Sequence, residues 1–195
     1  MLAETKRPKA IDPAQFDHRL FHWWPCRDVG LFADLRKNGS ARMGVLMAVF
    51  IREAHVEDKD ALGALKLRSS LAWGDHIEEL QALPEAREVP IAHVPHAIVA
   101  ELEGEIVGFV TVLSGKGAMQ AILEDLFVAP EVWRMGVGRK LLAEAEYRAA
   151  MLGARTLHVV AGERARPFYE AAGYRFAGTI AADFAPAVRL LKDLL

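Results

Sequence analysis

Hydrophobic and polar positions follow two periods along this chain from residue 48 onward. Short runs of apolar and β-branched residues predict strands over residues 48–54, 98–102, 106–113, 119–128, 156–160, 174–178 and 188–194. Runs with helical spacing predict helices over residues 57–70, 74–83, 136–151 and 165–172. Strands with helices interspersed predict an α/β fold whose sheet is mixed and largely antiparallel.

Two local signals are sharper than the rest. The helix over 136–151 places its apolar side chains on one stripe, and Gly153 follows it as a stop signal. The stripe consists of Val137, Leu141, Leu142, Ala145 and Ala149. The tripeptide Glu103-Gly104-Glu105 separates two strand-like runs and predicts a β-hairpin.

Residues 1–46 lack sustained periodicity and differ from the domain predicted over 47–195. They contain several prolines, the pair Trp23-Trp24 and the loop-like run Lys37-Asn38-Gly39-Ser40. Three explanations stay open for this irregular appendage: a disordered leader, a segment docked on the core, or sequence upstream of a misassigned start. We expect it to be poorly ordered and unnecessary for chemistry. No signal peptide is recognisable, so the cytoplasm is the expected location.

Composition removes several classes of function. The chain has 195 residues, of which 52% are hydrophobic and 26% charged, as in an ordinary globular protein. The net charge of −2 gives no electrostatic reason to expect a nucleic acid or a membrane as partner. Cys26 is the only cysteine, which excludes an internal disulfide and a cysteine zinc cluster. Among the seven histidines, His18 and His22 form the one i,i+4 pair, and there is no cysteine or carboxylate pattern of ligand spacing, so we expect no metal.

Residues 133–142, Trp-Arg-Met-Gly-Val-Gly-Arg-Lys-Leu-Leu, carry the most chemical information. They follow a predicted strand and open a predicted helix. The free N–H groups of a helix N-terminus hold phosphate well, and glycine lets a phosphate approach the backbone closely. Leu141 stands where a dinucleotide fingerprint needs its third glycine, and no Gly-Lys-Ser/Thr run exists for a P-loop. The sequence therefore predicts a phosphate-bearing ligand outside both common nucleotide-binding motifs.

The surrounding residues resemble the GCN5-related N-acetyltransferase (GNAT) superfamily. The run Leu123-Glu124-Asp125-Leu126-Phe127-Val128 precedes the glycine turn, and Pro167-Phe168-Tyr169-Glu170-Ala171-Ala172-Gly173-Tyr174 follows later. The family's Gln/Arg-x-x-Gly-x-Gly/Ala motif falls on Trp133 to Gly138, and its Phe-Tyr helix falls on Phe168 to Tyr174. The resemblance covers about residues 47–195. It departs from the family pattern at Trp133, where Gln or Arg is usual, and at Gly162, where many members have Asn.

The resemblance implies a cosubstrate, acetyl-CoA, and a place for it. Family members splay two neighbouring central strands, here 119–128 and 156–160, with helices on both faces of the sheet. The pantetheine arm enters the splay and pairs with strand amides. The expected cofactor-binding residues are Leu126, Phe127, Val128, Arg134, Met135, Gly136, Val137, Gly138, Arg139 and Gly162.

Acetyl transfer to an amine needs a base, an oxyanion site and a proton donor for the thiolate. We expect Glu124 to be the base, since burial among apolar neighbours would raise the pKa of its carboxyl group. The alternative is a solvated charge at a strand edge. We expect Tyr169 to be the acid, and the alternative is an aromatic packing partner of Phe168. By strand periodicity Asp125 points to the opposite face from Glu124 unless a bulge intervenes, where it is structural or pairs with a cationic substrate.

The acceptor pocket of the family is built from the first two helices and the last strands. Trp73 and Asp75 are candidate substrate-binding residues here, with His76, Glu78 and Glu79 beside them and Asp183 and Phe184 opposite. The alternative is a solvated helix face around one buried tryptophan. We expect direct transfer to a primary amine of a small molecule in a ternary complex. A protein lysine or N-terminus as acceptor and a non-catalytic acyl-CoA-binding module stay as alternatives, and homodimers through the last strands are common among relatives.

Overall fold

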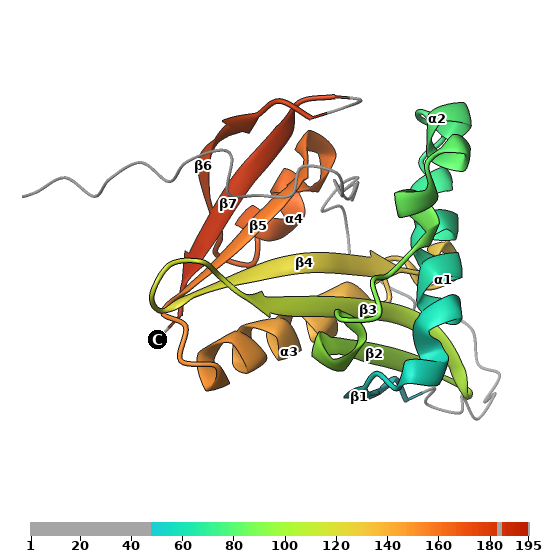
Figure 1. Ribbon diagram of the computed structural model, residues 1–195, viewed down its shortest axis with the longest axis horizontal. Helices are drawn as coiled ribbons and strands as arrows, with labels where there is room; N and C mark the ends of the chain where they lie inside the picture. The colour runs from blue at the N-terminus through green and yellow to red at the C-terminus, as the bar shows by residue number, and fades with distance from the viewer. Residues whose placement is uncertain (1–47, 183–184, 195) are drawn as a thin grey trace, which may run out of the picture.

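The computed structural model describes residues 48–182 and 185–194. The appendage over 1–46 and the acceptor-pocket candidates Asp183 and Phe184 lie outside these residues. The described strands form one seven-stranded sheet in the order β1-β2-β3-β4-β5-β7-β6 (Figure 1). The strands are β1 (Phe50–Glu53), β2 (Ala97–Leu102), β3 (Glu105–Ser114), β4 (Gln120–Val128), β5 (Thr156–Gly162), β6 (Arg175–Ile180) and β7 (Ala187–Asp193).

Within this sheet β4 and β5 run parallel, and the other neighbouring strands are antiparallel. The mixed, largely antiparallel sheet predicted from the sequence is therefore confirmed. The β2–β3 hairpin is confirmed as well, with positive φ at both Glu103 (54°) and Gly104 (85°). Two successive residues of positive φ characterise the tight turn that matches the twist of a hairpin.

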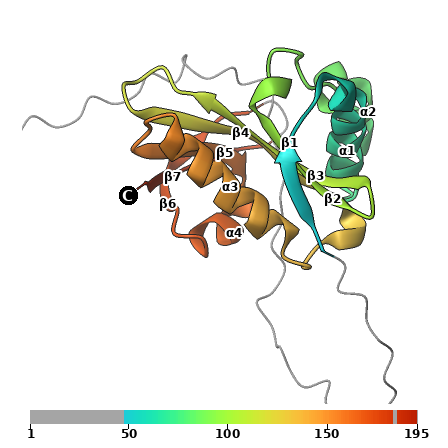
Figure 2. The ribbon, with the colours of Figure 1, turned by 90° about the horizontal axis from the view of Figure 1, so that it is seen from below.

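Helices cover both faces of the sheet (Figure 2). The α-helices are α1 (Lys59–Leu71), α2 (Ile77–Ala82), α3 (Val137–Met151) and α4 (Arg166–Glu170). Short 3-10 turns are η2 (Val56–Asp58), η3 (Pro84–Arg87), η4 (Val94–His96), η5 (Pro130–Val132) and η6 (Glu163–Ala165). One face carries α1 and α2, and the other carries α3. None of the helices formed by the described residues is both long and apolar enough to span a bilayer.

The helix predicted over 74–83 is shorter than expected. It begins at Ile77, because Gly74 (φ 75°) and His76 (φ 52°) adopt left-handed backbone conformations that a helix cannot contain. The strand predicted from residue 119 begins one residue later, since Met119 also has positive φ (59°). Both differences lie at element ends, where local conformation overrides the hydrophobic pattern.

The core lies between the sheet and the two helical layers. All five residues of the stripe predicted for α3 are buried. This helix packs so closely on the sheet that a Cβ added at Gly108 would lie 2.8 Å from Leu141 Cδ1 and 3.3 Å from Val137 Cγ1. The close packing fixes the N-terminal end of α3, which follows the glycine turn, against β3.

The central strand pair is splayed, as predicted. The pairing of β4 with β5 runs from Gln120↔Thr156 to Leu123↔Val159 and stops there. β4 continues to Val128 and stays paired with β3, whereas β5 continues to Gly162 and stays paired with β7. Two strand edges therefore diverge beyond Leu123 and Val159, next to the turn that opens α3.

Candidate functional site

The glycine turn leads from β4 into α3 through two left-handed residues. Arg134 has φ 65°, and Gly136, the N-cap of α3, has φ 85°. Val137, Gly138 and Arg139 form the first helical turn, whose N–H groups have no acceptor within the helix itself. The positive end of the helix dipole adds to these donors. The turn therefore presents a site that suits an anion.

The space at this helix end is open. A Cβ added at Gly136 would meet no heavy atom within 4 Å. Arg134, Met135, Gly136 and Arg139 are exposed, while Val137 and Gly138 are buried. Two exposed guanidinium-bearing residues thus flank the amide donors. This arrangement fits a pyrophosphate in charge and access.

Trp133, the departure from the family motif, has a structural position of its own. Its indole Nε1 donates to the Val128 carbonyl at 2.7 Å, and its ring stacks on Trp73 at 4.4 Å between centroids. Ser69 Oγ donates to the same carbonyl at 3.0 Å. The end of β4 is therefore fixed by donors from α1 and from the glycine turn, and the indole N–H is engaged with protein.

The expected pantetheine-binding residues lie on the diverging part of β4. Leu126, Phe127 and Val128 are buried and come after the last residue that pairs with β5. Gly162 is the last residue of β5 and lies opposite Ala187 of β7. The splay thus brings the residues predicted from separate motifs to two facing strand edges.

A β-bulge separates the two carboxylates of β4. Val112 pairs with Leu123, and the preceding residue, Thr111, pairs with Asp125, so Glu124 is the extra residue of β4 at this point of the β3–β4 ladder. Thr111 and Val112 are successive residues of β3 and point to opposite faces of the sheet. Their partners Asp125 and Leu123 therefore point to opposite faces as well. The exception to strand periodicity that the sequence left open at Asp125 was a β-bulge, and the structure contains this bulge.

The environments of the two carboxylates differ from the expectation. Glu124, the predicted base, is half-buried and not fully enclosed by its apolar neighbours. Asp125 is 1% exposed and lies 3.7 Å from Lys66 Nζ of α1. The deeply buried carboxylate of β4 is therefore Asp125, because it faces α1, whereas Glu124 occupies the bulge.

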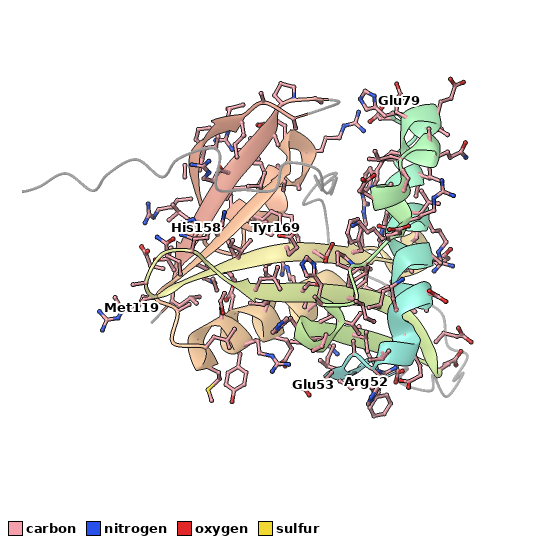
Figure 3. The ribbon with its side chains drawn as sticks, viewed as in Figure 1. Arg52, Glu53, Glu79, Met119, His158 and Tyr169 are labelled. Atoms are coloured by element: carbon pink, nitrogen blue, oxygen red, sulfur yellow. The ribbon has the colours of Figure 1, made fainter. Side chains whose placement is uncertain are left out.

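Tyr169 lies on α4 and is 3% exposed; Figure 3 labels it beside β5. Its ring contacts Phe168 and Tyr174 edge to face, at 5.2 and 5.4 Å between centroids. Burial raises the pKa of the Tyr169 phenol above its ordinary value of 10.0. The hydroxyl therefore keeps its proton at neutral pH, as a proton donor must. Its role as the acid stays a prediction.

The loop between α1 and α2 meets both sides of the splay. Trp73 stacks on Trp133 of the glycine turn, and Asp75 forms an ion pair with Arg164, which follows β5. The structure therefore brings the candidate acceptor residues next to the candidate cofactor residues. Glu78 and Glu79 are exposed, and Figure 3 shows Glu79 at the outer end of α2.

Three residues at this site were missed by sequence reasoning. Lys66, Ser69 and Arg164 contact Asp125, the Val128 carbonyl and Asp75 respectively. Lys66 and Ser69 are polar side chains at helical spacing from Leu62 and Leu65, on the stripe of α1 that is buried. These polar residues on the otherwise apolar stripe of α1 were the sequence signal that could have identified Lys66 and Ser69. Arg164 carried no signal, since its partner is distant in sequence. Within residues 48–182 and 185–194, no cluster of His, Cys, Asp or Glu could hold a metal ion.

Comparison with known proteins agrees with this geometry. Residues 94–176, which include the splayed strands, the glycine turn and Tyr169, match the family model of the acetyltransferase (GNAT) domain. This match and a curated relative support the GNAT superfamily for the chain. GNAT enzymes are acyl-CoA-dependent N-acetyltransferases, and this is the enzyme class of the chain. A curated relative, the uncharacterized N-acetyltransferase YhfO of Bacillus subtilis (strain 168), is 29% identical over 133 residues, which are 64% of this chain and 88% of YhfO.

Solved GNAT structures share the fold. PaiA N-acetyltransferase from Thermoplasma acidophilum, in complex with coenzyme A, matches with a TM-score of 0.63 and 19% identity, over 75% of this chain and 99% of PaiA. N-acetylglutamate synthase from Neisseria gonorrhoeae, complexed with coenzyme A and N-acetyl-glutamate, matches with a TM-score of 0.57 and 21% identity. The match covers 76% of this chain but only 35% of the synthase. Both identities are low, so these matches bear on the fold alone.

Proposed function

We propose that this GNAT enzyme transfers an acetyl group from acetyl-CoA to the primary amine of a small molecule, by direct attack in a ternary complex. The observation that carries the proposal is the splay between β4 and β5 beside the open N-terminus of α3. A pantetheine arm between the strand edges would leave its pyrophosphate at the amides of Val137, Gly138 and Arg139. The acyl group would then lie beside the bulge that contains Glu124.

The proposed chemistry assigns one role to each group. Glu124 accepts a proton from the acceptor amine, directly or through one water, and the amine nitrogen attacks the thioester carbonyl carbon. Amides of Leu126 to Val128 stabilise the tetrahedral oxyanion. The carbon–sulfur bond then breaks, and the Tyr169 hydroxyl gives its proton to the departing thiolate. Cys26, the only cysteine, precedes the domain, which favours direct transfer over an acyl-enzyme.

We place the acceptor beside the loop between α1 and α2. Trp73 and Asp75 are there, and their contacts with Trp133 and Arg164 hold this loop beside the cofactor site. Asp125 is already paired with Lys66, so we expect its effect on acceptor binding to be indirect.

Calorimetric titration of the full chain tests cofactor binding. We expect micromolar affinity for acetyl-CoA, and weaker binding of CoA lacking the 3′-phosphate if the guanidinium groups beside the turn contact it. Absence of binding at millimolar ligand would overturn the proposed cofactor site.

Glu124→Gln separates an enzyme from a binding module. Loss of the general base should lower kcat by about 10²- to 10⁴-fold and leave acetyl-CoA binding intact. Glu105→Gln, at an exposed carboxylate where β3 begins, is the matched control and should change neither. Release of CoA thiol would be measured with a panel of small amines and with peptides bearing free lysines or N-termini. Turnover of peptides alone would favour the protein acetyltransferase, and unchanged turnover by Glu124→Gln would refute the base.

A further inference from the structure

A buried ion pair lies directly under the bulge of β4. Lys66 Nζ is 3.7 Å from Asp125 Oδ1, and the two side chains are 3% and 2% exposed. Lys66 also donates to the Glu88 carbonyl at 3.2 Å and lies 6.0 Å from the centroid of the Phe127 ring. The pair therefore joins the middle of α1 to β4 on the face opposite α3.

Two further polar residues of the described chain lie near this pair. Thr111, the ladder partner of Asp125, is fully buried. His93, in the turn before η4, is close enough to feel the charges of both Asp125 and Lys66. Burial lowers the pKa of His93, so its imidazole is neutral at neutral pH. Lys66 therefore forms an ion pair with Asp125 beside a neutral imidazole.

Stability alone does not explain such a pair. Moving two charges out of water is costly, and apolar side chains of similar volume are often equally stable or more stable in the same place. An ion pair fixes the orientation of both side chains, which apolar contacts do not. Here the ion pair fixes Asp125, which directly follows Glu124. Glu124 is the extra residue of the β-bulge.

We infer that Lys66 is a positioning residue for the acetyl transfer. By holding the Asp125 carboxylate against α1, it fixes the β4 backbone at the bulge, and the fixed backbone sets the direction in which Glu124 points. Lys66 is too deeply buried to touch the acceptor or the cofactor site, so it acts only through β4. The inference rests on the proposed role of Glu124 as the base.

A double variant tests the inference. Lys66→Met and Asp125→Asn each leave one buried charge without its partner, so both single variants should unfold at lower urea concentration. Lys66→Met/Asp125→Asn removes both charges, and its urea midpoint should return toward that of the wild type. If Lys66 positions the base, kcat of the folded double variant stays about 10- to 100-fold low, since small misplacement of a catalytic group has effects of this size.

Two further readouts distinguish positioning from a merely structural role. The affinity for acetyl-CoA and the KM for acetyl-CoA should be unchanged in the double variant, and the acidic limb of the pH–kcat profile should move because the surroundings of the base Glu124 have changed. Arg52→Met/Asp58→Asn removes a 2.7 Å ion pair between β1 and η2, together with the contact of Arg52 to Glu101, and should leave kcat unchanged. Recovery of wild-type kcat together with stability in the Lys66/Asp125 double variant would overturn the inference.

The failure of the inference differs from the failure of the proposed function. If Glu124→Gln is inactive and the double variant has wild-type kcat, the base stands and positioning by Lys66 is refuted. If Glu124→Gln keeps full activity, the base assignment is wrong and the inference falls with it.

Discussion

At the residue scale, the surroundings of Tyr169 decide which chemistry its hydroxyl can perform. Burial between Phe168 and Tyr174 disfavours the phenolate and raises the pKa of the phenol. A group that stays protonated across the physiological range can donate to a thiolate but cannot act as a base. The direction of the pKa shift therefore agrees with the proposed acid role and disagrees with a basic one.

Removing this hydroxyl should slow turnover without weakening binding. We expect Tyr169→Phe to lower kcat by about 10²-fold, since general acid catalysis contributes at least this much. The affinity for acetyl-CoA, measured by calorimetry, should stay the same, because the ring and its edge contacts remain. Tyr174→Phe is the matched control, as Tyr174 is equally buried and packs on Tyr169. Equal turnover by the two variants would leave Tyr169 with a packing role only.

Residue types could be predicted here better than their environments. The sequence placed two carboxylates together on a strand and indicated Glu124 as the buried one. The bulge made Asp125 the buried residue, because it places Asp125 rather than Glu124 opposite the buried Thr111. A bulge depends on how two strands pair, which strand periodicity within β4 alone cannot reveal. The cation that accompanies Asp125 comes from α1, some sixty positions earlier in the chain, and was missed for the same reason.

At the element scale, the turn between β4 and α3 requires glycine for its backbone conformation. Gly136 has φ 85°, where a Cβ is strained, although no neighbouring atom would meet one. Strain of this kind costs about 1–2 kcal/mol. The sequence predicted the glycine for close approach of a phosphate, and the structure adds this conformational reason.

The two reasons can be separated with a matched pair of variants. Gly104 also has φ 85° and also has open space, but it lies in the β2–β3 hairpin away from the splay. Gly136→Ala and Gly104→Ala should therefore lose similar unfolding free energy, about 1–2 kcal/mol each by urea titration. Only Gly136→Ala should weaken acetyl-CoA binding in calorimetry. Equal affinity in both variants would mean that the phosphate does not approach Gly136.

The departure at Trp133 shows what a motif can and cannot predict. The sequence identified Trp133 as unusual, since Gln or Arg is usual at this position of the family motif. The indole donates to the Val128 carbonyl and stacks on Trp73, so it joins three segments that are separate in sequence. The identity of these partners follows from the folded arrangement and from no local pattern.

At the scale of the whole molecule, features set by local sequence could be predicted, whereas features set by contacts between distant residues could not. The hairpin, the α3 stripe and the splayed pair follow from periodicity, turn residues and the family resemblance, and they are confirmed. The position of β7 between β5 and β6, by contrast, has no local signal, since β6 precedes it in the chain. Ion pairs across the fold, such as Asp75 with Arg164, belong to the same class. They form because folding brings distant residues together, and they border the proposed site.

The pH dependence of stability is a further property of the whole molecule. Burial lowers the pKa of both His93 and His158 below the usual value of 6.5; His158, on β5, is labelled in Figure 3 and is only 4% exposed. Nearby Arg189 and Arg175 lower the pKa of His158 further. Both imidazoles are therefore neutral in the folded protein at pH values where the unfolded chain has begun to protonate them.

The sign of the effect follows from proton binding. Below about pH 6.5 the unfolded chain binds protons that the folded chain does not, so acid favours unfolding. The free energy of unfolding should be level from pH 7 to 8 as far as these groups are concerned and should fall as the pH drops below 6.5. One histidine contributes a slope of at most about 1.4 kcal/mol per pH unit. Urea titrations at a series of pH values measure this slope directly.

A substitution at His158 assigns its share of the slope. His158→Leu keeps an apolar side chain of similar size in the sheet and removes the titrating group, so the fall in stability below pH 6.5 should become shallower. An unchanged slope in His158→Leu would mean that His158 gains protons equally in the folded and unfolded chains. Its burial in the sheet would then have no effect on protonation, contrary to the structure.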